Sequence, residues 1–206
     1  MIMVVQTPKL KVNNKRGDYM KRVFRYNGKD SVMQLAKTLK QVSGDNPVFF
    51  CVGSEKSVID SLGPKIGTHL KKRSDGKLVV YGIQGDAITA LNVQKAYRAV
   101  KHIHPTSKII VIDAALGDST GTIRVENDGI RPGSGTGKDL GIIGDEGIIC
   151  TFRRSHFTYR EDNILFMGDE DNIFVTQSMR NKYNRLNKYV NTAVDTIANA
   201  ILLAAA

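Results

Sequence analysis

The chain has 206 residues, of which 41% are hydrophobic and 24% are charged. A chain of this length and composition can bury a core without disulfides or metal ions, which excludes disorder along the whole chain. No apolar run approaches the ~20 residues of a membrane-spanning helix, and residues 1–5 lack the pattern of a secretory signal. Cys51 and Cys150 each lie inside an apolar run. We therefore expect buried, reduced thiols in a cytoplasmic protein with no membrane partner.

The net charge is +10, from 30 Lys and Arg residues against 20 Asp and Glu residues. An excess of this size raises the question of a nucleic-acid or acidic partner. The basic residues are dispersed, however, and no ribonucleoprotein, zinc-knuckle or helix-turn-helix pattern accompanies them. We expect mostly solvated helix faces and loops, with weak, non-specific nucleic-acid binding at most.

Residues 1–29 are polar and basic with poor periodicity, and predict a basic N-terminal arm. Residues 30–206 show no linker or repeat and predict a single domain. Its first half alternates helical and buried-strand patterns: a helix from Ser31 to Val42 that stops at Gly44, then a strand at 47–52, a helix at 61–72, a strand at 78–81, a helix at 91–103 and a strand at 108–113. This alternation predicts an α/β fold with a mostly parallel sheet and helices on both faces.

The second half is less regular. Residues 121–126 alternate like a half-exposed strand, and residues 147–152 form another buried run. A glycine-rich loop lies between these two segments. Residues 153–171 predict an insertion or a projecting hairpin, and residues 175–204 predict one long helix.

Two acidic residues follow predicted strands. Asp60 ends the loop after the 47–52 strand, and Asp113 is the last residue of the 108–113 strand. Ligands of open parallel sheets bind outside the carboxyl ends of the strands. If these two strands are neighbours in the sheet, the two carboxylates share one crevice and provide an acid and a base. Each residue also has a purely structural explanation. Asp60 could cap the following helix, and Asp113 could form a turn at its strand end.

Other catalytic patterns are absent from the sequence. The segment from Arg131 to Lys138 is rich in glycine but fails the P-loop pattern, because Asp139 stands where that loop requires Ser or Thr. It predicts a turn at the edge of a site. The four histidines are too dispersed for a zinc site, and no serine lies in a nucleophile elbow. We therefore expect neither a metal site nor a cofactor.

Three blocks in the same order resemble sporulation proteins of the YyaC type, which are small relatives of the spore germination protease and the hydrogenase maturation proteases. The blocks are Cys51-Val-Gly-Ser-Glu-Lys-Ser-Val-Ile-Asp60-Ser-Leu-Gly-Pro64, Val111-Ile-Asp113-Ala-Ala-Leu-Gly117 and Gly129-Ile-Arg-Pro-Gly-Ser-Gly-Thr-Gly137. The resemblance covers roughly residues 30–152. It implies a three-layer α/β/α sandwich of the phosphorylase/hydrolase-like kind.

The resemblance also implies roles for particular residues. The proposed catalytic aspartates of the germination protease correspond here to Asp60 and Asp113. Residues expected to bind substrate, in part by holding an oxyanion through backbone N–H groups, are Gly53, Ser54, Gly133, Ser134, Gly135 and Gly137. Hydrogenase maturation proteases carry a further histidine that completes a metal site. This chain has no histidine near Gly144-Asp145, which argues against nickel-guided maturation.

The sequence leaves two functions open. The first is a peptidase with a paired-aspartate site that cleaves a protein or peptide, such as a small spore protein, in a sporulating cell or spore. The second is a non-enzymatic sporulation protein that binds a protein or nucleic acid through its basic surface. In the first case Arg153, Arg154, His156 and Arg160 would rim the crevice and attract acidic substrate segments. The sequence does not determine the substrate or the oligomeric state, and it is compatible with an oligomer.

Overall fold

The structure is a computed structural model that describes residues 3–4, 22–132, 141–153 and 177–206. The elements in these ranges are β1 (Met3–Val4), β2 (Val23–Arg25), α1 (Ser31–Val42), β3 (Val48–Cys51), α2 (Leu62–Arg73), β4 (Val79–Tyr81), α3 (Val93–Ile103), β5 (Ile109–Gly117), β6 (Thr122–Asn127), β7 (Glu146–Arg153) and α5 (Gln177–Ala204). Each helix and strand expected from the sequence is present, and all except β5 lie at nearly the expected residues. The expected hairpin or insertion at 153–171 lies almost wholly outside the described residues.

All the strands belong to one mixed sheet with the order β2-β6-β7-β5-β3-β4, and β1 pairs with β5. Strand β5 runs parallel to β1, β3 and β7, and β3 runs parallel to β4. Strand β6 is antiparallel to both β7 and β2. Only residues 118–121 separate β5 from β6, which is too short for a crossover, so the chain reverses direction there. The fold is therefore α/β with a mixed sheet.

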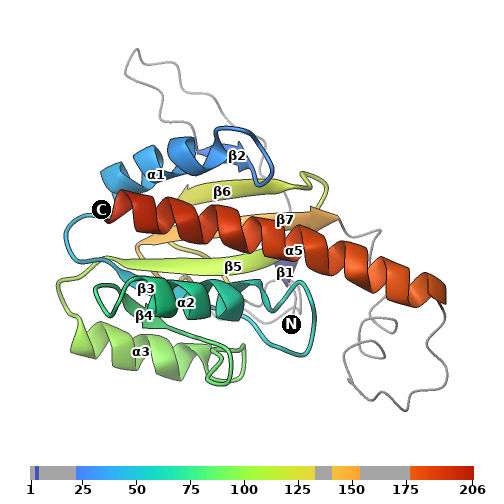
Figure 1. The fold of residues 1–206 in the computed structure, drawn as a ribbon. Coiled ribbons are helices and arrows are strands. Elements are labelled where there is room, and N and C mark those ends of the chain that lie inside the picture. The colour runs from blue at the N-terminus through green and yellow to red at the C-terminus, as the bar shows by residue number, and fades with distance from the viewer. Residues whose placement is uncertain (1–2, 5–21, 133–140, 154–176) are drawn as a thin grey trace.

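Two hydrophobic clusters cover opposite faces of this sheet. On one face α5 packs between α1 and α2, as Figure 1 shows, and these helices bury side chains such as Leu39, Ile66 and Ile197 against the sheet. On the other face α3 contributes Val93 and Val100 to a second cluster. The neighbouring strand positions Ile110 and Val111 enter opposite clusters, as expected for a strand that is buried on both faces.

Part of the expected N-terminal arm belongs to the fold. Val23–Arg25 forms the edge strand β2, and Phe24 is buried in the larger cluster. The Thr196 hydroxyl of α5 donates a hydrogen bond to the Tyr26 carbonyl at 2.6 Å. These contacts attach the residues just before α1 to the C-terminal helix.

Strand β5 is longer than the sequence predicted. The expectation ended the strand at Asp113, whereas pairing with β7 continues from Ile110 to Gly117. The apolar residues 114–116 are buried, so they extend the strand through the middle of the sheet. Asp113 therefore lies inside β5 and not at its end. Among the described helices, none is long and apolar enough to cross a membrane.

Candidate functional site: a buried aspartate pair where β3 ends

The site begins where β3 leaves the sheet. The Val52 N–H still donates to the Ile112 carbonyl of β5 at 2.8 Å, but the Gly53 N–H donates to Ile88 at 2.8 Å, away from β5. Gly53 has a φ of +150°, and a Cβ atom at this position would lie 2.0 Å from the Asp60 carbonyl oxygen. Only glycine permits this turn together with so close an approach. The loop that follows is thereby folded back over the end of β3.

Asp60 is placed by this loop. The Ser54 N–H donates to the Asp60 carbonyl oxygen at 3.0 Å, which closes the loop, and the Asp60 residue is only 2% exposed. The N-cap residue of α2 is Ser61, whose hydroxyl donates to the Val58 carbonyl at 2.6 Å. Asp60 lies one residue before the N-cap position, so helix capping does not account for it.

Asp113 lies on the strand next to this loop. The last residue of β3, Cys51, is opposite Ile112, so Asp113 is the first residue of β5 beyond the end of its neighbour. Asp113 is 4% exposed, and its Oδ1 accepts the Ala114 N–H at 2.8 Å. By the alternation of a strand, its side chain shares a face with Val111 and Ala115. A turn at a strand end, the structural alternative for this residue, does not occur here.

The electrostatics of the two carboxyl groups are coupled. Burial raises the pKa of Asp113 well above its usual value, and the charge of Asp60 raises this pKa further. Burial also raises the pKa of Asp60, against a backbone hydrogen bond from Ser54 that lowers it. The loop after β3 and the middle of β5 thus bring together two carboxyl groups that are far apart in the sequence. A pair of this kind retains a proton where two isolated carboxyl groups would have lost both, and the larger rise of the pKa of Asp113 favours this residue as the one that holds the proton.

The residues expected to bind substrate are only partly described. The N–H groups of Gly53 and Ser54 are both used within the protein, by Ile88 and Asp60, so here they shape the loop. Gly133, Ser134, Gly135 and Gly137 lie outside the described residues. The base of their loop is described: Ile130 and Ile143 exchange two backbone hydrogen bonds of 2.9 Å, and both side chains belong to the smaller cluster, on the same face as Val111.

The other groups that could carry chemistry do not form a second site among the described residues. Cys51 and Cys150 are buried and free, and burial raises the pKa of both thiols, which disfavours a nucleophilic thiolate. In the part of the chain that the structure describes, no three His, Cys, Asp or Glu side chains gather as a metal site would require. Arg154, His156 and Arg160 lie outside that part, and Arg153 ends β7.

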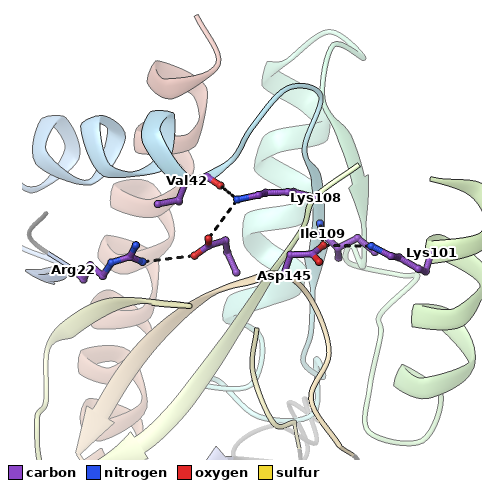
Figure 2. Close-up of polar contacts among 7 residues, drawn as sticks. Arg22, Val42, Lys101, Lys108, Ile109 and Asp145 are labelled. Atoms are coloured by element: carbon purple, nitrogen blue, oxygen red, sulfur yellow. Dashed lines mark hydrogen bonds and ion pairs between the residues drawn. The ribbon is translucent and has the colours of Figure 1, made fainter. Parts of the chain in front are cut away.

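A second group of charged residues lies at the opposite end of the strands. Glu146 at the start of β7 lies 3.6 Å from both Arg22 and Lys108, and the Lys108 ammonium also donates to the Val42 carbonyl at 2.7 Å (Figure 2). Neighbouring Asp145 accepts the Ile109 N–H at 2.8 Å and pairs with Lys101 at 3.6 Å. Because each charge has a partner that links two elements, this group ties the strand starts to α1 and α3 and is structural.

Two cavities also lie away from the aspartates. One, of about 310 Å³, is lined by residues that include Tyr26, Phe152 and Tyr189. The other, of about 670 Å³, lies between the ends of α1 and α5 and the start of β4. Neither contains a titratable pair like Asp60 and Asp113. The chemistry of the aspartates, rather than the size of a cavity, identifies the candidate site.

The sequence did not predict that residues 3–4 reach this region. Strand β1 pairs in parallel with β5, with Met3 opposite Ala115 and Val4 opposite Leu116. These β5 residues come directly after Asp113 and Ala114. The short apolar stretch at residues 1–5 was the available signal, but without a turn or alternation it did not indicate a strand.

The fold and the buried acid pair define an α/β protein with a candidate functional site. Comparison with known proteins assigns it to a family: residues 23–165 match the family described as "Protein of unknown function (DUF1256)", and the chain belongs to that family. It is also similar to the uncharacterized protein YyaC of Bacillus subtilis (strain 168), with 33% identity over 113 residues. That match covers 54% of this chain and 55% of YyaC, about half the length of each. No solved structure matches the chain.

Proposed function

We propose that this protein is a peptidase in which Asp60 and Asp113 act as an acid–base pair on a protein or peptide substrate. The observation that carries the proposal is that two carboxyl groups, 2% and 4% exposed, are buried close enough for the charge of Asp60 to raise the pKa of Asp113. Keeping two carboxyl groups buried side by side costs stability, and such costs are concentrated at functional sites. The resemblance to the spore germination protease supplies the reaction class.

The chemistry follows from the unequal surroundings of the two groups. Asp60, favoured as the ionised member, accepts a proton from a water molecule whose oxygen then bonds to the peptide carbonyl carbon. Asp113 holds the shared proton and gives it to the amide nitrogen as the C–N bond breaks. One water is consumed, and the products are a carboxyl group and an amine. No metal ion or cofactor takes part in this scheme.

The proposal includes the finer architecture. Helices α1, α2 and α5 on one face and α3 on the other are consistent with a three-layer α/β/α sandwich, and we assign it to the phosphorylase/hydrolase-like kind because the three sequence blocks resemble those of the germination protease group. The position of Asp113 at the point where β3 leaves β5 agrees with the binding of ligands at strand ends in open sheets. A small spore protein in a sporulating cell is the substrate that this resemblance suggests.

The test is cleavage by the full chain of a protein extract from bacterial spores and of a synthetic peptide mixture, with mass spectrometry of the newly formed termini. We expect Asp60→Asn and Asp113→Asn each to reduce cleavage at least ~10²-fold, because each removes one partner of a proton transfer. Asn preserves the volume, and its Oδ1 at position 113 can still accept the Ala114 N–H.

The matched control is Asp195→Asn. Asp195 is exposed on α5, where its carboxylate lies 3.8 Å from a ring nitrogen of His69, and its substitution should leave cleavage unchanged. Wild-type rates in either site variant would show that the acid pair is not catalytic. Absence of cleavage in both mixtures by the wild-type protein would count against the peptidase.

The chain's charge of +10 supports a second candidate, a binding protein for nucleic acid. In the described part of the chain, Lys71, Lys72 and Arg73 form an exposed basic turn at the end of α2. Binding of DNA and RNA should be measured at ~150 mM salt, where phosphate contacts are strongly screened. Submicromolar binding that is lost when these three residues become Gln, and is kept in Asp60→Asn, would favour this candidate over the peptidase.

A further inference from the structure

The edge of β5 beyond Asp113 is not covered by β3. Strand β3 covers β5 only as far as Ile112, whereas β5 continues to Gly117. On its other side β5 is paired with β7 over this whole length, up to Gly117 opposite Arg153. The side of β5 that β3 leaves therefore presents backbone groups directly after Asp113.

The hydrogen-bond pattern shows which groups face this edge. Lys108 and Ile112 direct their carbonyl groups to the N–H groups of Val48 and Val52 on the β3 side. Because backbone groups alternate along a strand, Ala114 and Leu116 direct theirs to the same side. The Ala114 N–H is taken by the Asp113 carboxylate. The Ala114 carbonyl and both backbone groups of Leu116 are therefore the groups with which a strand on this edge can pair.

In the structure this place is taken by residues 3–4. Met3 lies opposite Ala115, so its backbone fits between Ala114 and Leu116 in the manner of a parallel ladder. The chain itself thus shows that an extended segment can lie on this edge, in which direction it runs and with what register. In a peptide bound with this register, the residues before the one opposite Ala115 would lie level with Asp113.

We propose that the protein binds its substrate as an extended peptide that adds to the β5 edge in parallel, in the place that β1 takes here. This inference rests on the proposed function and adds the mode of substrate recognition. Backbone hydrogen bonds to Ala114 and Leu116 hold the peptide independently of its side chains. Because the peptide runs parallel to β5, the bond that reaches the aspartates lies on the N-terminal side of the docked residues. Strand β1 competes with the substrate for this edge. The apparent affinity for the substrate is the intrinsic affinity multiplied by the fraction of molecules in which β1 has left the edge.

The test uses the full chain with two matched proline substitutions. Met3→Pro removes the N–H that the register directs at Ala114, whereas Val4→Pro removes one that faces away from β5. The probe is a fluorescein-labelled peptide with the sequence of residues 1–8, Met-Ile-Met-Val-Val-Gln-Thr-Pro. We expect Met3→Pro to bind the probe at least ~10-fold more tightly than the wild type, and Val4→Pro to differ from the wild type by less than ~3-fold.

Hydrogen exchange locates the binding. The Leu116 amide should exchange slowly in the wild type, at least ~10-fold faster in Met3→Pro, and slowly again in Met3→Pro with bound probe. N-methylation of the third residue of the probe should abolish binding, whereas N-methylation of the fourth should not. Urea unfolding midpoints of the two variants that match the wild type would show that the sheet is intact.

Several results would overturn the proposal. These are equal probe affinities of the wild type and Met3→Pro, equal effects of the two N-methyl groups, or protection by the probe at amides other than those of residues 114–117. The peptidase proposal can be refuted independently of strand addition. Probe binding at the β5 edge without any cleavage would reject catalysis and keep strand addition. Cleavage that depends on Asp60 and Asp113 but not on the third-residue N–H would reject strand addition and keep catalysis.

Discussion

Gly53 is the residue on which the geometry of the candidate site depends most directly, and Gly53→Ala tests that dependence. The new methyl group would lie 2.0 Å from the Asp60 carbonyl oxygen and 3.0 Å from the Pro64 ring. The oxygen cannot move away easily, because it accepts the Ser54 N–H at 3.0 Å in the same loop. We therefore expect the substitution to force the Asp60 loop away from the end of β3.

The magnitude has two parts. A side chain at a φ of +150° costs about 1–3 kcal/mol of strain, and an overpacked contact against backbone costs about 1–3 kcal/mol more. We expect Gly53→Ala to lower the free energy of unfolding by ~2–6 kcal/mol. Urea unfolding followed by far-UV circular dichroism measures this, since the slope of the transition reports whether two-state behaviour is kept.

Two further substitutions separate the cost of the backbone conformation from the cost of the steric contact. Gly76→Ala, at a φ of +76° with nothing within 4 Å of the new methyl group, carries a conformational cost alone and should lose only ~1–2 kcal/mol. Gly63→Ala in α2 carries the contact alone, 2.0 Å from the Val52 carbonyl oxygen. Alanine at a helix position with free space would instead add ~1 kcal/mol of stability. A stable Gly63→Ala, or equal losses for Gly53→Ala and Gly76→Ala, would refute the close packing of loop and helix on the end of β3.

Two other predictions concern charged groups. Burial and the charge of Asp60 raise the pKa of Asp113, so the folded state holds a proton that the unfolded chain loses near ~pH 4. The contribution of Asp113 to the free energy of unfolding is therefore most favourable below ~pH 4 and declines as pH rises through the raised pKa. Asp113→Asn should therefore unfold at higher urea than the wild type at pH 7 and at the same urea near pH 3; an unchanged difference across this range would contradict the coupling. Glu146→Gln leaves Lys108 and Arg22 without their shared carboxylate and should cost ~1–2 kcal/mol in low salt, less in 1 M salt. A loss below ~0.3 kcal/mol, as is common for exposed pairs, would show that the cluster in Figure 2 is not stabilising.

The elements of the fold could be read from the sequence because their signals are local. The apolar face of residues 32–42 gives α1 at its predicted bounds, and the uninterrupted apolar run after Pro47 gives β3. Strand order and direction could not be read in this way. The short link from β5 reverses the direction of β6, but its partner is β7, about 25 residues later in the chain, and no local pattern specifies that partner.

The candidate site was predictable as a pair of positions but not as a geometry. The rule that ligands lie at strand ends led to the prediction that Asp60 and Asp113 share a site, and the charge of Asp60 does raise the pKa of Asp113, although Asp113 lies within its strand and not at its end. The relevant end is that of β3, and the register that sets it, Cys51 opposite Ile112, is a long-range property. The hydrogen bonds of the Gly53 and Ser54 N–H groups, to Ile88 and Asp60, could likewise not be predicted from the sequence.

The position of the site also explains why glycines surround it. Cβ atoms at Gly63 and Gly82 would lie within about 2 Å of the carbonyl oxygens of Val52 and Cys51, so α2 and the turn after β4 both approach the last residues of β3 at backbone distance. This close packing excludes water from the region, and the exclusion of water is what raises the pKa values of the two aspartates. The same glycines that allow the strand to end there therefore create the electrostatic condition for acid–base chemistry. An alanine at Gly82 should accordingly perturb the titration of Asp113, observed by carbon-13 NMR of its carboxyl group, even though residue 82 belongs to another strand connection. An unchanged titration of Asp113 in a folded Gly82→Ala variant would show that this close packing does not raise the pKa of Asp113, and would refute the explanation.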